Sequence, residues 1–317
     1  MAVTIRDLTE SSHSYVSFNA SRNLEGKAGP IPEETLLKDT KITSLIQELQ
    51  DWPGPQISSH KSARQFFHKL VFLADIGLNL ATPGIAGITE KILSETDETE
   101  IPCLHTIIPE GYGGVGKPVK AWALCDAPNT LYALIKLGVR NQKIDTAVEN
   151  LASLSEPFGF SCRVSPSLGS WRGPGKKTEP CPYATLIMLK LLLLVRDKFK
   201  NIIGACAETL LDLWENSRIK HPYIFYMGND FRKLKLPFIW YDLLHVVFVL
   251  SQVKEAPGDQ RFQEMYSIIK GKETEAGFIP ESVYQPWKDW DFGQKKQPSE
   301  GMTYWVRRIE AAIEKGS

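Results

Sequence analysis

The stretch Asp126-Ala-Pro-Asn-Thr-Leu-Tyr-Ala-Leu134 recurs in altered form along the chain and underlies the expected fold. Cys181-Pro-Tyr-Ala-Thr-Leu-Ile-Met-Leu189 and Asp242-Leu-Leu-His-Val-Val-Phe-Val-Leu250 align with it without gaps. Weaker copies start at Gln65 and Ser299, so the repeat returns roughly every sixty residues. Each copy is apolar on nearly every face, which predicts a helix buried inside the protein.

A second, amphipathic helix is expected after each of the first four copies. Apolar residues recur there at i, i+3 and i+4 with charges between them, so one face is buried and the other is solvated. The expected helices cover 85–94, 144–154, 201–214 and 260–270. Five to six such α-hairpins, each with an inner and an outer helix, predict an all-α fold in the form of an α/α toroid or an open solenoid.

Residues 1–55 differ from the rest of the chain, because they are polar and hold one short helix candidate at 42–49. We expect an N-terminal arm or edge helix there, with a sixth hairpin as the alternative. The toroid domain would then cover 56–317. Alternating Val, Ile and Thr residues are confined to short loop pieces, so strands are poorly supported.

The composition argues against several classes of function. The 317 residues carry 37 Lys and Arg against 37 Asp and Glu, so a nucleic-acid binder that relies on bulk positive charge is not expected. The longest apolar run, 186–195, is too short for a membrane span, and the N-terminus lacks the apolar core of a secretion signal. Five scattered cysteines favour a reducing compartment. We therefore expect a cytoplasmic protein with a small-molecule ligand; a homodimer or a partner subunit stays open.

Chemistry is expected at the N-termini of the inner helices, because these ends meet on one side of a toroid. The polar residues placed there are Asp126, Asn129, Glu179, Cys181, Tyr183, Asp242 and His245. A thiolate, an imidazole and a carboxylate form a zinc ligand set, and three protein ligands leave a fourth position for substrate. The plainer interpretation is that Cys181 is a small buried apolar residue and His245 a hydrogen-bonded core histidine.

The loops before these helices are basic and aromatic. The basic residues are Arg172, Lys176 and Lys177 before Cys181, and Arg232 and Lys233 before Asp242; the aromatic residues include Trp171, Trp240 and Tyr241. Cations beside helix N-termini hold anions, phosphate above all, so we expect these residues to bind an anionic head on an apolar substrate. The alternative is that the charges are only solvated.

The repeat resembles that of the terpenoid cyclases and of the β subunits of protein prenyltransferases, which share an α/α toroid. The resemblance covers residues 60–315 and rests on a Gly-rich turn followed by a helix of the Thr-Leu-x-Ala-Leu kind. Proton-initiated cyclases carry Asp-x-Asp-Asp-Thr-Ala, in which the central Asp is the acid. The matching stretch here is Asp126-Ala-Pro-Asn-Thr-Leu131. Pro128 occupies the position of the acid, so proton-initiated cyclisation by this motif is not expected.

The prenyltransferase β subunits match more of the site. Their zinc is held by the Asp and Cys of Asp-x-Cys and by a distant His. The resemblance implies Glu179, Cys181 and His245 as zinc ligands, with Glu in place of the family's Asp. It also implies Arg172 and Lys176 as residues that bind the diphosphate.

Three functions are compatible with these residues. The leading one, implied by the resemblance, is a zinc-dependent prenyltransferase-like enzyme that acts on a diphosphate-bearing apolar substrate. The alternative keeps the fold without a metal, as a cyclase-like or lyase-like enzyme with Asp126 or Asp242 as general acid or base. Tyr183 is a further catalytic candidate. The third function is a non-catalytic α-toroid that binds an anionic ligand or a protein partner.

Overall fold

Helices make up almost all the regular structure of the computed structural model, which describes residues 3–25, 31, 33–171, 173, 178–219 and 225–316. The expected all-α fold is confirmed. The chain divides into two compact units. We call Ser44–Phe225 the central unit, and Met1–Thr43 together with Tyr226–Ser317 the terminal unit. The expected division into an N-terminal arm over 1–55 and a toroid domain over 56–317 stays a prediction.

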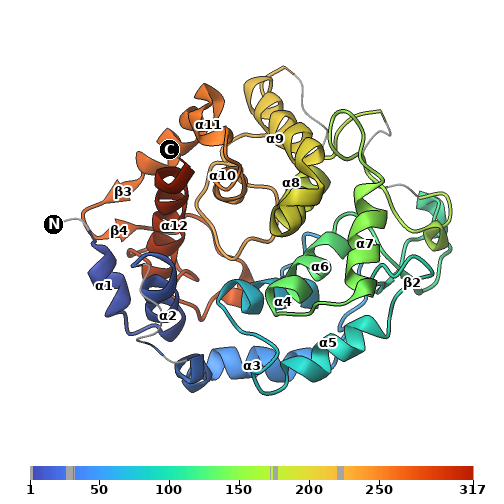
Figure 1. Ribbon diagram of the computed structural model, residues 1–317, viewed down its shortest axis with the longest axis horizontal. Coiled ribbons are helices and arrows are strands. Elements are labelled where there is room, and N and C mark those ends of the chain that lie inside the picture. The colour runs from blue at the N-terminus through green and yellow to red at the C-terminus, as the bar shows by residue number, and fades with distance from the viewer. Residues whose placement is uncertain are drawn as a thin grey trace. The chain divides into compact units, whose positions relative to one another are not determined.

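Three buried helices lie next to one another in the central unit. They are α4 (Phe66–Asp75), α6 (Ala127–Lys136) and α8 (Pro182–Leu192). α6 contacts both of the others (Figure 1). Every residue of α4 and of α8 is buried, as expected for helices that are apolar on nearly all faces. The N-caps are Gln65, Asp126 and Cys181, the residues at which the repeat predicts each start.

An amphipathic helix follows each inner helix of the central unit. These outer helices are α5 (Ile85–Leu93), α7 (Gln142–Ala152) and α9 (Lys200–Glu215). α7 packs against α6, and α9 packs against α8, so both pairs are α-hairpins. Asn141 caps α7, because its side chain accepts a hydrogen bond from the backbone N–H of Ile144. The predicted helix starts are confirmed to within two residues.

A buried ion pair connects the inner helices of the central unit. The Lys190 ammonium of α8 lies 3.0 Å from the Asp75 carboxylate at the end of α4. The Tyr132 hydroxyl of α6 also donates a hydrogen bond to Asp75. Burial alone would raise the pKa of Asp75, but the Lys190 and Lys136 charges lower it. The charged residue in the most apolar run of the sequence is therefore the partner of a buried carboxylate.

The terminal unit combines both ends of the chain. Its helices are α1 (Ile5–Thr9), α2 (Ser14–Asn23), α10 (Leu243–Leu250), α11 (Gln260–Lys270) and α12 (Glu300–Gly316). α10 contacts α11 and α12, and α12 contacts α1 and α2 (Figure 1). Asp242 is the N-cap of α10, and α12 begins directly after Ser299, as the repeat predicts. The Asn23 amide donates a hydrogen bond of 3.0 Å to the Tyr304 hydroxyl, which ties α2 to α12.

The N-terminal segment is more helical and more buried than its polar composition suggests. Residues 15–21 of α2 are all buried. The Ser17 hydroxyl donates to the Ser14 carbonyl, and the Asn19 amide donates to the Tyr15 carbonyl. These side chains satisfy their hydrogen bonds within their own helix, so they can be buried without a large penalty.

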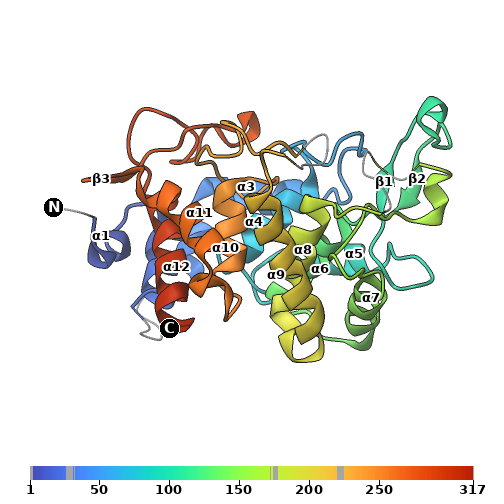
Figure 2. The same cartoon turned by 90° about the horizontal axis from the view of Figure 1, so that it is seen from above.

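The remaining elements are short. They are the strands β1 (Leu104–Thr106), β2 (Val119–Ala121), β3 (Glu273–Thr274) and β4 (Gly277–Phe278), the helix α3 (Thr40–Leu49), and the 3-10 turns η1 (Glu33–Lys38), η2 (Glu110–Tyr112), η3 (Pro166–Leu168), η4 (Leu193–Lys198), η5 (Ala256–Gly258) and η6 (Gln285–Trp287). β1 pairs with β2 and β3 with β4, both antiparallel; Figure 2 shows the first pair side by side. α3 contains the helix predicted at 42–49 and runs from the terminal unit into the central unit. In the described parts of the chain, none of the helices combines the length and the apolar character needed to cross a bilayer.

Candidate functional site

In the central unit, Asp126 is paired with a histidine. His60 Nε2 lies 2.7 Å from Asp126 Oδ2, and the two side chains are 11% and 1% exposed. The second oxygen of Asp126, Oδ1, accepts a hydrogen bond of 3.2 Å from the Ala123 backbone N–H. His60 lies in the loop before α4, whereas Asp126 is the N-cap of α6. An imidazole and a carboxylate in contact can exchange a proton, so this pair is a candidate acid–base unit.

A second histidine positions the segment that carries His60. His68 Nε2 donates a hydrogen bond of 2.8 Å to the His60 carbonyl. Burial lowers the pKa of His68 to about 3, so its ring is neutral in the folded protein. His68 therefore acts as a fixed hydrogen-bond donor.

Tyr183 lies close to the same helix N-terminus. The Asn129 amide donates a hydrogen bond of 3.1 Å to the Tyr183 hydroxyl, so these two predicted site residues do meet. Tyr183 is fully buried, and this burial, with a contribution from Cys125, raises the pKa of its hydroxyl well above the usual value. The group is neutral at physiological pH and can act as a hydrogen-bond donor but not as a base.

Cys181 lies among other thiols. The backbone N–H of Cys181 donates a hydrogen bond of 2.7 Å to the Phe160 carbonyl, which brings the segment around Cys162 to the start of α8. A hydrogen bond between the Cys162 and Cys181 thiols, together with burial, raises the pKa of Cys181 well above its usual value. Cys125 contributes to the same shift. Cys181 therefore carries its proton in the folded protein.

In the terminal unit, Asp242 is a fully buried carboxyl at the start of α10. Its Oδ1 atom accepts a hydrogen bond of 3.0 Å from the His245 backbone N–H. Its Oδ2 atom is buried and has no hydrogen-bond partner among the described residues. Burial raises the pKa of Asp242 to about 7, although the Lys235 charge opposes the shift. The carboxyl is therefore close to half protonated at neutral pH.

His245 lies one turn into α10 and is held on two sides. Its Nδ1 atom lies 3.0 Å from the Trp240 carbonyl, which can only accept, so Nδ1 carries the proton of the neutral ring. The ring stacks on Phe238, with centroids 4.9 Å apart. Phe238 also contacts Phe248 and Trp305, so His245 belongs to an aromatic cluster. The lone pair of the neutral ring is therefore on Nε2. In this tautomer Nε2 is the ring nitrogen that could bind a metal ion.

The predicted anion-binding residues are described only in part. Arg172, Lys176 and Lys177 lie outside the described residues. Lys233 lies 3.4 Å from the Asp230 carboxylate, and Arg232 is half-buried, with its carbonyl accepting a hydrogen bond from Lys272.

The predicted aromatic residues serve local packing in the described structure. Trp171 packs against a small apolar cluster that includes Ile108 and Leu168. Tyr241 is buried with its ring 5.2 Å from Phe231. Trp240 contributes the carbonyl that holds the His245 ring.

The predicted zinc ligands fall in different units. Glu179 and Cys181 belong to the central unit and His245 to the terminal unit. Within the described residues of the chain, no three His, Cys, Asp or Glu side chains gather in a way that could hold a metal ion. His245 suits zinc by its tautomer, whereas Cys181 would first have to lose its proton. The zinc site stays a prediction.

Sequence reasoning missed His60 and the grouping of Cys125 and Cys162 with Cys181. No local pattern marks these residues, because His60 lies 66 positions from Asp126 in the chain. The pairing of 123 with 164 in an antiparallel bridge brings the segments of Cys125 and Cys162 together.

No family model matches this chain, and no curated protein matches it.

Proposed function

We propose that this protein is an enzyme that uses general acid catalysis on a largely apolar substrate, with Asp242 as the acid. The observation that carries the proposal is the state of this carboxyl: it is fully buried, its pKa is about 7, and its Oδ2 atom lacks a hydrogen-bond partner among the described residues. A general acid is most effective when its pKa lies near the working pH. A buried carboxyl with such a pKa is also uncommon outside functional sites.

The surroundings of Asp242 support proton donation. The His245 backbone N–H occupies Oδ1, so the proton of the neutral carboxyl resides on Oδ2. Leu243 and Leu244 follow directly and, like Asp242, are fully buried, so the carboxyl lies in apolar surroundings. After the proton has left, the N-terminus of α10 favours the resulting negative charge. Burial thus raises the pKa so that a large share of the acid is protonated at neutral pH, and the helix stabilises its conjugate base.

The arrangement of the inner helices is part of the proposed function. In the central unit α6 contacts α4 and α8, and in the terminal unit α12 contacts α10 and α2. We propose that these six helices are the inner helices of one α/α toroid, with α2 supplying the sixth repeat. The resemblance to terpenoid cyclases and prenyltransferase β subunits supports this arrangement, as does the common position of the N-caps in the repeat.

A zinc-dependent prenyltransferase-like enzyme is the second candidate. The observation in its favour is His245, whose Nδ1 is held by a carbonyl, which places the lone pair of the neutral ring on Nε2, the atom that would bind the metal. Glu179, Cys181 and His245 would hold the ion. Zinc in such a site would bind and activate the nucleophile of an acceptor.

The test uses the full chain, with farnesyl diphosphate and squalene as probe substrates in deuterated buffer. We expect products that carry solvent deuterium, formed in the presence of EDTA. Asp242→Asn should lower their rate by about a hundredfold or more, because the amide cannot donate the proton. The matched control is Asp259→Asn, since Asp259 is also the N-cap of a helix in the terminal unit.

The outcomes separate the two candidates. Full activity of Asp242→Asn would overturn general acid catalysis by this residue. In a parallel reaction that adds a thiol acceptor to farnesyl diphosphate, formation of the prenyl thioether and diphosphate that is abolished by EDTA, restored by zinc and lost in His245→Ala would support the transferase instead. Absence of any product from both substrates would leave no support for either enzyme.

A further inference from the structure

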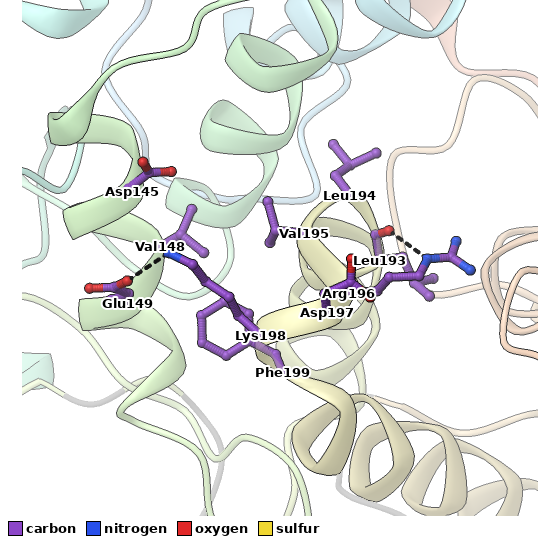
Figure 3. A pocket seen from close by; sticks show the side chains of 10 residues that line it. All are labelled: Asp145, Val148, Glu149, Leu193, Leu194, Val195, Arg196, Asp197, Lys198 and Phe199. Atoms are coloured by element: carbon purple, nitrogen blue, oxygen red, sulfur yellow. Dashed lines mark hydrogen bonds and ion pairs between the residues drawn. The ribbon is translucent and has the colours of Figure 1, made fainter.

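A second site of the central unit lies apart from all the residues discussed above. A cavity of about 310 Å³ opens between α7 and the connection from α8 to α9 (Figure 3). Its size is at the lower end of the range for small-molecule sites. None of the predicted catalytic, substrate-binding or metal-binding residues lines it.

The two walls of the cavity follow from local structure. One wall is a single face of α7, because Asp145, Val148 and Glu149 are spaced i, i+3 and i+4. The other is the segment 193–199, in which α8 gives way to the 3-10 turn η4. Val195 leaves the helical conformation there, with φ −132° and ψ 34°. The turn is therefore irregular at the point where it faces α7.

Apolar side chains form much of the lining. Val148 and Leu193 are buried, while Leu194, Val195 and Phe199 are only half-buried. Figure 3 shows Val148 and Val195 on the facing walls. The cavity therefore leaves apolar surface that a ligand could cover.

The charges around this surface leave an excess of carboxylate. Lys198 reaches across to Glu149, with 3.1 Å between the ammonium and the carboxylate, so these two charges neutralise each other. Arg196 donates to the Leu193 carbonyl, and Figure 3 shows its guanidinium directed away from α7. Asp145 and Asp197 have no ion-pair partner among the described residues. Asp145 lies on the α7 wall, beside Val148.

We propose that this cavity binds a small organic cation with an apolar body. The cationic group lies against Asp145, and the apolar body covers Val148, Val195 and Phe199. The Glu149–Lys198 pair closes one side and leaves the charge of Asp145 uncompensated. An anionic ligand of the same shape would meet this carboxylate and is disfavoured by its charge.

The experiment compares three probes of matched shape: benzylammonium, benzyl alcohol and benzoate. Binding to the full chain is followed by the chemical shifts of labelled Val and Leu methyl groups. We expect benzylammonium to bind tightest and to shift the methyl groups of Val148 and Val195. Asp145→Asn should weaken this binding about fivefold, as expected for an exposed charge pair. Binding of benzyl alcohol should not change.

Two further variants make the test decisive. Glu90→Gln removes an exposed carboxylate from the outer helix α5, outside the cavity, and should leave all three affinities unchanged. Val195→Trp fills the cavity from a half-buried position and should abolish the binding of every probe. The proposal is overturned if benzoate binds as well as benzylammonium, if Asp145→Asn behaves like Glu90→Gln, or if the shifts map elsewhere. Since no activity is measured, failure of the Asp242 mechanism would not affect the result.

Discussion

Asp242 couples the proposed chemistry to the stability of the protein. Burial holds the pKa of its carboxyl at about 7, above the usual value of 3.8. Below both values the group is protonated in the folded and the unfolded chain. As the pH rises from 4 to 7, only the unfolded chain gains by ionising, so stability falls through this window. The shift corresponds to a loss on the order of 4 kcal/mol.

Asp242→Asn should remove this pH dependence. Asn is a good N-cap, so the start of α10 stays capped while the ionisable group is lost. We expect the variant to show a flatter dependence of the urea midpoint on pH between 4 and 7, and to exceed the parent protein in stability at pH 7. Equilibrium unfolding at several pH values measures this. Parallel curves for the two proteins would show that Asp242 is not held neutral.

At the scale of elements, the start of α12 depends on a glycine. The Gly301 backbone N–H donates a hydrogen bond of 2.8 Å to Asp291 Oδ2, while the Tyr15 hydroxyl donates to Oδ1 of the same carboxylate. A Cβ atom on Gly301 would lie 2.0 Å from the Tyr15 hydroxyl oxygen. The close approach of α2, and not an unusual backbone angle, therefore requires glycine at this position.

Gly301→Ala should destabilise the protein by about 1–3 kcal/mol, although alanine is intrinsically the better helix former by about 1 kcal/mol. The clash with Tyr15 is the reason. In a Tyr15→Phe background the same substitution should cost less, because the clashing oxygen is gone. A double-mutant cycle from urea unfolding gives the coupling energy. Equal costs in both backgrounds would contradict the contact.

At the scale of the whole chain, the two ends form one unit. Asn23 and Tyr304, which are 281 positions apart in sequence, share a hydrogen bond, and α2 covers part of α12. The first residues are thus an integral part of the terminal unit, although their polar sequence resembles that of a loose arm.

Removal of residues 1–25 should accordingly weaken the terminal unit. We expect faster amide hydrogen exchange in α12, because the face covered by α2 becomes exposed, and in α10, because it packs against α12. The contacts within α4, α6 and α8 are unaffected by the truncation, so their protection should be retained. Exchange measured by mass spectrometry compares the two forms. Unchanged protection of α12 would show that the segment is dispensable.

The starts of the inner helices can be predicted from the amino-acid sequence alone. Gln65, Asp126, Cys181 and Asp242 are N-caps at the positions predicted by the repeat. The signal is local and strong, because each helix is uniformly apolar and each outer helix is amphipathic. Helical periodicity and capping depend on neighbours within a few positions, so one sequence is sufficient to read them.

The partners of the candidate catalytic groups come from tertiary structure. His60 reaches Asp126 across 66 positions, and Asn129 reaches Tyr183 across 54. The burial of α2 is likewise decided by α12, at the other end of the chain. The pKa of Asp242 depends on how completely the folded chain excludes water around it. Such contacts depend on which elements pack together in space. The spacing of residues along one sequence does not determine which elements these are.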